Sequence, residues 1–426
     1  MKKYIFSIVM LLSATILQAQ SNSQFTIHDS QLSTVNSQLS TLNCQLSTKL
    51  DSLIATSPLL ETTQLGLMVW DLTADSVLYA YNHRQRMRPA STMKLLTAIT
   101  MLDLYGGNYQ FTTEVRYNGE IVGRTLVGDL ICVGCMDPSF DNGDMNYLVD
   151  RIRVAGIDTI CGRIVADKSM KDTLLLGQGW CWDDDNPCLS ALLLNRKDNF
   201  VNRLTTLLTD VGVVIMEHGT LNMEHGTLNI EHGTLNMENS QLSTVNSPLS
   251  TVHSPLNEIL TRMMKQSDNL YAETIFYHTA LSIARPATQK NARTAVRQLI
   301  QRLGFDPAQY TVADGSGLSL YNYLSPELLT AFLRHAWRNE SIRRHLEPSL
   351  PIAGIDGTLK DRMKNTAAYR NVRAKTGTLT GISSLAGYAT AANGHQLAFA
   401  IINQGIVKAK DGKAFQDKVC ALLCGE

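Results

Sequence analysis

Three short motifs, each present once and in a fixed order, constrain this chain more than any other feature. They are Ser91-x-x-Lys94, Ser267-x-Asn269 and Lys375-Thr376-Gly377. Each motif alone is a weak signal, because triplets of common residues arise by chance in a chain of 426 residues. Their joint occurrence is a strong signal, and it indicates that three distant parts of the chain contribute to one site.

The first motif is expected at the start of a helix. Pro89 precedes Ser91, and the helix-forming run MKLLTA follows it. Lys94 then lies one turn further on, on the same face. A serine hydroxyl becomes a good nucleophile when a nearby base takes its proton. Lys94 can be that base when burial and a second cation, Lys375, disfavour its charged form. The simpler alternative is that Ser91 caps the helix and Lys94 faces solvent.

The set of three motifs is the signature of serine enzymes that open D-alanyl peptides and β-lactams. In this chemistry Ser267 passes a proton to the leaving amine, and Asn269 holds the amide of the substrate. Lys375 and the hydroxyl groups of Thr376 and Thr378 bind the terminal carboxylate.

Gly377 and two main-chain N–H groups complete the expected site. Glycine allows close approach of a strand to the substrate. The N–H groups of Ser91 and Thr378 are the expected oxyanion hole. The N-terminus of the helix, with its partial positive charge, also stabilises negative charge that develops at the serine.

The sequence resembles the class C low-molecular-mass penicillin-binding proteins, the DacB-like D-alanyl-D-alanine carboxypeptidase/endopeptidase family (peptidase S13). The blocks that carry this resemblance are RPASTMKLLTA, HSPLNEILTRMMKQSDNLYAE, ADGSGLSLYNYLSPELL, LPIAGIDGTLKDRM and RAKTGTLTGISSLAGYA. TLVGDLICVGCMDPSF and GQGWCWDDDNP resemble its inserted domain. The resemblance implies an α+β fold: a penicillin-recognising, transpeptidase-like (β-lactamase-like) domain with a five-stranded antiparallel sheet flanked by helices, and a β-rich domain inserted between the first two motifs.

The sequence departs from the family pattern in three places, one of which is CVGCMDPS, with cysteines where the family more often has glycine or apolar residues. The inserted region ends in one expected helix, Phe200 to Val213, followed by repeats, so the insert looks truncated. Leu320 stands where the family often has arginine. The preceding turn, Asp314 to Ser319, is either a direct part of the site or only a glycine-rich turn.

The N-terminus and the segment that follows the insert contain unusual sequences. The stretch MKKYIFSIVMLLSATILQAQ has the build of a secretory signal peptide. Seven-residue repeats such as SQLSTVN and MEHGTLN are rich in Gly, Ser, Thr and Asn, and their odd period suits neither a coiled coil nor a continuous strand. The expected organisation is a signal peptide (1–20), a repeat linker (21–48), a catalytic domain (49–108 and 255–426), an inserted domain (109–215) and a second repeat linker (216–254).

Local patterns predict several elements. An opening helix is expected over Leu50 to Leu60, and a pair of strands over Leu65 to Leu72 and Ser76 to Asn82. A β-rich block follows from Phe111 to about Asp172, and a last helix from Lys410. Cys420 and Cys424 are expected to be buried in that last helix.

Composition excludes some classes of protein. Lys plus Arg equals Asp plus Glu, at 38 each, so nucleic acid is not an expected partner. The CxxC pair Cys132 and Cys135 lacks a second pair with nearby histidines, so no metal is expected, although local disulfides stay open. No cofactor is expected.

The functional hypothesis is a periplasmic serine carboxypeptidase that acts on D-Ala-D-Ala of peptidoglycan peptides, with endopeptidase action left open and β-lactams as acylating inhibitors. No later apolar run is long enough for a transmembrane anchor. One alternative is a β-lactamase, but the Glu-x-x-Leu-Asn pentad of the class A enzymes is absent. The other alternative is a non-catalytic wall-binding protein.

Overall fold

The computed structural model describes residues 45–182, 185–216, 220–224, 227–231 and 248–425. The predicted signal peptide and residues 21–44 of the first repeat linker lie outside this range. The chain forms two units, Met1–Pro58 and Leu59–Glu426. In the first unit residues 45–55 are helical, which corrects both the linker prediction for residues 45–48 and the helix predicted over 50–60. The reason is the helical spacing of Leu46, Leu50 and Ile54, which extends into the last repeat.

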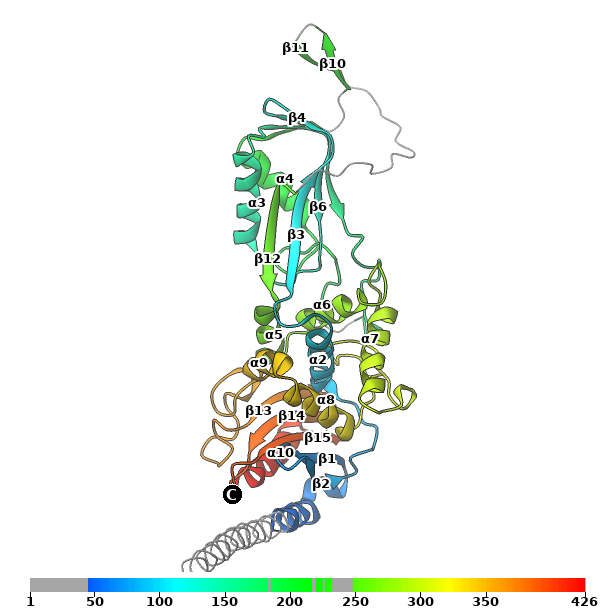
Figure 1. The fold of residues 1–426 in the computed structure, drawn as a ribbon, viewed down its shortest axis with the longest axis vertical. Helices are drawn as coiled ribbons and strands as arrows, with labels where there is room; N and C mark the ends of the chain where they lie inside the picture. The colour runs from blue at the N-terminus through cyan, green and yellow to red at the C-terminus, as the bar shows by residue number, and fades with distance from the viewer. Residues whose placement is uncertain (1–44, 183–184, 217–219, 225–226, 232–247, 426) are drawn as a thin grey trace, which may run out of the picture. The chain divides into compact units, whose positions relative to one another are not determined.

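In the second unit, a five-stranded antiparallel sheet runs in the order β13-β14-β15-β1-β2 (Figure 1). Its strands are β1 (Gln64–Asp71), β2 (Ser76–Tyr81), β13 (Arg373–Leu379), β14 (Ile382–Thr390) and β15 (Gln396–Gln404). The predicted pairing of the first two strands is therefore confirmed. On β14, Ser383 contacts α10 (Ala409–Leu423) and Tyr388 contacts α8 (Pro326–Arg338). Odd and even positions of a strand point to opposite faces, so these helices cover the two faces of the sheet.

A cluster of helices packs beside this sheet around one apolar core. The helices are α2 (Met93–Tyr105), α5 (Leu256–Lys265), α6 (Asn269–Ala280), α7 (Gln289–Arg302), α8 and α9 (Glu340–Ser349). Every residue of α6 from Leu270 to Ala280 is buried, as expected for a helix packed on all sides. Because α2 contacts α6, and β13 contacts the turn before α2, the fold brings the three motifs together.

The inserted region has its own apolar core and two four-stranded sheets, β12-β3-β6-β8 and β4-β5-β7-β9. The elements are β3 (Gln110–Tyr117), β4 (Glu120–Val122), β5 (Thr125–Val127), β6 (Leu130–Val133), α3 (Asn142–Val154), β7 (Thr159–Cys161), β8 (Ile164–Asp167), α4 (Phe200–Asp210), β9 (Val214–Met216) and β12 (Ser250–Pro255). The helix predicted from Phe200 is present, and it ends early because Gly212 adopts a φ of 86°. The helix α3 was not predicted, although Asp141 and Asp144 form a capping box at its start.

The second repeat segment is partly structured, which corrects the prediction of a linker over 216–254. Its described residues include a hairpin of β10 (Thr220–Glu224) and β11 (Thr227–Glu231), and β12 pairs with β3. The odd repeat period reverses the buried face only in a strand that continues through several units. Here each strand takes up about one unit, so the reversal has no consequence.

Two further observations complete the fold. Cys420 is buried in α10 and Cys424 is buried directly after it, as predicted. Within the part of the chain that the structure describes, no helix has both the length and the apolar character needed to cross a membrane.

Candidate active site

Ser91 lies in a single 3-10 turn, η2 (Ala90–Thr92), that leads directly into α2. Ala90 adopts a left-handed φ of 47°, which turns the chain sharply before the serine. Lys94 is fully buried, and its Nζ lies 3.0 Å from Ser91 Oγ. The structure therefore excludes the simpler alternative, in which Lys94 faces solvent.

Lys94 has two more partners from distant parts of the chain. Its Nζ donates to Asn269 Oδ1 at 2.8 Å and to the main-chain oxygen of Ser316 at 2.7 Å. Burial lowers the pKa of Lys94 to about 8, although the negative charges of Asp314 and Glu273 oppose this shift. Lys94 therefore gives up its proton far more readily than an ordinary lysine.

Lys375 is a second fully buried lysine, on the edge strand β13. Its Nζ donates to Ser267 Oγ at 2.8 Å and to the main-chain oxygen of Thr376 at 2.7 Å. Burial and the nearby charge of Lys94 hold the pKa of Lys375 well below its usual value. The two lysines thus compete for protons in one low-dielectric site.

Gly377 marks the place where β13 passes against the turn of Ser91. A Cβ atom at Gly377 would lie 2.9 Å from Ser91 N and 2.8 Å from Pro89 O, so only glycine allows this approach. Thr376 is buried and Thr378 is exposed on the same strand. All eight site residues that the sequence predicted therefore lie on the three segments that meet here.

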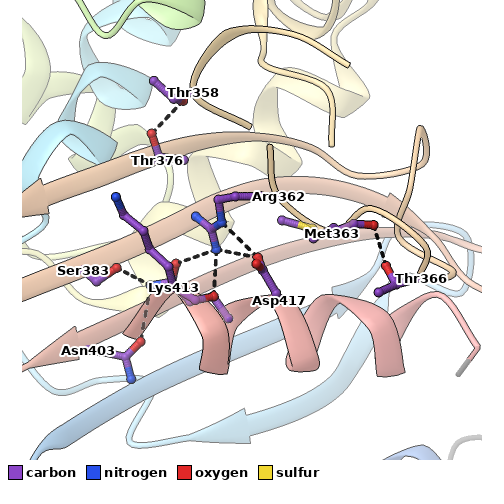
Figure 2. A network of polar contacts seen from close by, with 10 residues as sticks. Thr358, Arg362, Met363, Thr366, Thr376, Ser383, Asn403, Lys413 and Asp417 are labelled. Carbon is purple, nitrogen blue, oxygen red and sulfur yellow. Dashed lines mark hydrogen bonds and ion pairs between the residues drawn. The ribbon is translucent and has the colours of Figure 1, made fainter. Parts of the chain in front are cut away.

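Figure 2 shows the polar contact of Thr376 with the neighbouring loop, and the contacts that hold this loop on α10. Thr376 Oγ1 lies 2.7 Å from Thr358 Oγ1, in the short turn η4 (Gly357–Leu359). Arg362, next along this loop, donates to Asp417 Oδ1 at 2.7 Å and to the main-chain oxygen of Lys413 at 3.0 Å, both on α10. The loop that carries Thr358 is therefore anchored on the helix behind the sheet.

The turn from Asp314 to Ser319, whose role was left open by the sequence, contacts Lys94 through a main-chain oxygen. The oxygen of Ser316 reaches Lys94, and the main-chain N–H of Ser316 donates to Glu273 at 2.7 Å. Asp314 accepts from the N–H groups of Gly317 at 2.8 Å and Ser319 at 2.7 Å, which closes the turn. The sequence signal for Glu273 was its position four residues after Asn269, on the same face of α6.

The class of protein follows from this geometry. A serine at the start of a helix, a buried lysine of lowered pKa beside it, and a second buried lysine on an edge strand define a serine acyl-transfer enzyme of the penicillin-recognising fold. The sequence model of the D-Ala-D-Ala carboxypeptidase 3 (S13) family matches residues 46–196 and 230–424, and the chain belongs to this family.

Known relatives agree with this assignment. The chain is 26% identical over 412 residues to the D-alanyl-D-alanine carboxypeptidase DacB of Haemophilus influenzae, covering 81% of this chain and 86% of the relative. It is 27% identical to a D-alanyl-D-alanine carboxypeptidase of an Actinomadura species, covering 83% and 80%. The crystal structure of penicillin binding protein 4 from H. influenzae superposes with a TM-score of 0.73 at 23% identity, covering 87% and 98%. The predicted family and fold class are therefore confirmed.

Proposed function

We propose that this protein removes the terminal D-alanine from peptidoglycan stem peptides through an acyl-enzyme on Ser91. The single observation that carries the proposal is the fully buried Lys94 Nζ, 3.0 Å from Ser91 Oγ. Its other two partners, Asn269 Oδ1 and Ser316 O, are carbonyl oxygens and can only accept hydrogen bonds.

This set of partners orients the neutral amine. A neutral lysine has two N–H groups and one lone pair, and the two carbonyl oxygens take the two hydrogens. The lone pair is then directed at the hydroxyl of Ser91, which donates its proton to Lys94. The base is thus aligned before the substrate arrives, and no rearrangement is needed at the moment of attack.

In the reaction, Ser91 Oγ forms a bond to the penultimate D-alanyl carbonyl carbon, and the C–N bond to the terminal D-alanine breaks. The proton taken by Lys94 reaches the leaving amine through the hydroxyl of Ser267. The N–H groups of Ser91 and Thr378 stabilise the oxyanion. Water then hydrolyses the ester and releases the shortened peptide.

The terminal carboxylate of the substrate has a second effect in this mechanism. Lys375, Thr376 and Thr378 bind this carboxylate, and Gly377 allows the strand to lie close to it. A carboxylate beside Lys375 favours the ammonium form of Lys375, because the two opposite charges pair in the buried site. Binding of the substrate therefore helps Lys375 to keep the proton with which it holds the carboxylate.

The remaining parts of the proposal concern organisation and setting. Residues 59–108 and 255–426 are assigned to the catalytic domain and 109–254 to the inserted region, while residues 49–58, which the sequence placed in the catalytic domain, belong to the first unit. The predicted signal peptide supports a periplasmic location, and β-lactams act as acylating inhibitors because they present a carbonyl and a carboxylate in the same arrangement as D-Ala-D-Ala.

The test is acylation by a labelled penicillin, followed by peptide mapping. The label should lie on the peptide that contains Ser91, and Ser91→Ala should remove it. Wild-type protein that takes no label, or a label on Ser267, contradicts the proposal, and rapid drug turnover without an adduct favours a β-lactamase. Mass analysis of digested wall peptides then separates carboxypeptidase products from those of cross-link cleavage.

A further inference from the structure

The residue between Ser267 and Asn269 is a nearly buried aspartate whose partner comes from the inserted region. The side chain of Asp268 is 8% exposed. Arg196 donates to both of its oxygens, at 2.6 Å to Oδ2 and 3.1 Å to Oδ1, and Arg262 donates to Oδ2 at 3.2 Å. Such a two-point contact fixes direction as well as distance.

Asp268 also determines the start of α6. Its Oδ1 accepts from the N–H of Leu270 at 3.1 Å, which makes Asp268 the N-cap of the helix. Its two neighbours in the chain are the site residues Ser267, in contact with Lys375, and Asn269, in contact with Lys94. A shift of this one carboxylate therefore moves two reacting groups together.

The backbone is strained at Ser267, the residue that precedes Asp268. Ser267 adopts a left-handed φ of 59°, which side chains other than glycine seldom adopt. A conformation of this kind persists only when the surrounding contacts impose it. The ion pair between Asp268 and Arg196 is such a contact.

Arg196 is itself presented by a strained turn. Leu194 and Lys197 exchange main-chain hydrogen bonds of 2.9 and 3.0 Å, and the two residues between them, Asn195 and Arg196, have φ values of 48° and 69°. The turn is anchored on the start of α3, where Asn195 Nδ2 donates to Asn142 Oδ1 at 2.9 Å. Asparagine tolerates this conformation, but the conformation is unfavourable for arginine. The ion pair of Arg196 with Asp268 offsets this cost.

We infer that Arg196 is a positioning residue, supplied by the inserted region, that holds Asp268 and thereby keeps Ser267 and Asn269 in their reactive positions. This inference rests on the proposed function of Ser91. It also gives the insert a part in catalysis, because the insert then contributes a contact without which the second motif loses its geometry.

The test measures the second-order rate of Ser91 acylation by labelled penicillin together with the melting temperature. Arg196→Ala should lower the acylation rate about 10- to 100-fold, as expected for a misplaced reacting group. Arg163→Ala is the matched control: Arg163 forms an ion pair of 2.9 Å with Asp129 inside the insert, at similar exposure, and should leave the rate unchanged.

Two further variants separate positioning from stability. Arg196→Gly removes the same guanidinium but relieves the left-handed backbone, so it should melt at a higher temperature than Arg196→Ala and acylate equally slowly. The double variant Arg196→Ala with Asp268→Asn should be acylated at the same rate as Asp268→Asn alone, because the contact of Arg196 is already lost in the single variant. An acylation rate that recovers in Arg196→Gly, or additive losses in the double variant, would overturn the inference. Absence of label in wild-type protein would instead refute the proposed function.

Discussion

If Lys94 is the base, the rate of acylation should rise with pH through the pKa of Lys94. The pKa of Lys94 is about 8, compared with 10.5 for an ordinary lysine, which means that the protein destabilises the ammonium form by about 3 kcal/mol relative to the neutral amine. The neutral fraction is then about 1% at pH 6, about 10% at pH 7 and about 90% at pH 9. Since only the neutral amine accepts the proton of Ser91, the rate should increase about tenfold per pH unit below pH 7 and level off above pH 9.

The assay is the second-order rate constant of Ser91 labelling between pH 6 and 10 at constant ionic strength. Lys94→Arg is the companion variant, because it keeps the positive charge but cannot give up a proton, and it should nearly abolish labelling. A rate that is independent of pH over this range, a midpoint near that of an exposed lysine, or an active Lys94→Arg variant would refute the assignment of Lys94 as the base.

Two of the remaining predictions concern contacts of the Lys-Thr-Gly strand, and the third concerns the second repeat segment. Gly377→Ala should nearly abolish acylation and lower the melting temperature. The reason is that the new Cβ would lie 2.8 Å from Pro89 O and 2.9 Å from Ser91 N, and neither main-chain atom can move freely. Normal labelling of this variant would contradict the close approach of β13 to Ser91. Thr358→Val should raise the KM for peptides with a free terminal carboxylate and leave kcat nearly unchanged, because Thr376 loses the hydroxyl partner that orients it. The control variant Thr358→Ser should behave as wild type, and equal KM values for the two variants would refute this role. Deletion of residues 217–236 should leave melting temperature and acylation rate nearly unchanged, because the described strands of this segment, β10 and β11, pair only with each other. A large decrease in melting temperature or in acylation rate would show that the segment is part of the fold.

Local patterns were sufficient for a large part of the fold. The strand-like runs at residues 65–72 and 76–82 predicted the pair of strands, and a helix was predicted from Phe200, where α4 begins. Such patterns are readable because side chains a few residues apart share one face of a helix or strand. Errors arose where a local rule was extended too far, as when the odd repeat period, which argues only against a continuous strand, led to the prediction of a linker where separate short strands form.

The three motifs were sufficient to predict the residues of the proposed site, because they carry a nucleophile, two amines and hydroxyl groups in a recognisable order. The contacts and the burial of these groups became visible with the folded chain. The carbonyl of Ser316 that orients Lys94, and the contact of Arg196 with Asp268, join segments far apart in the chain and leave no periodic pattern. The lowered pKa of Lys94 likewise follows from burial among many elements. Burial and long-range contacts depend on the packing of the whole chain, and a short motif cannot encode them.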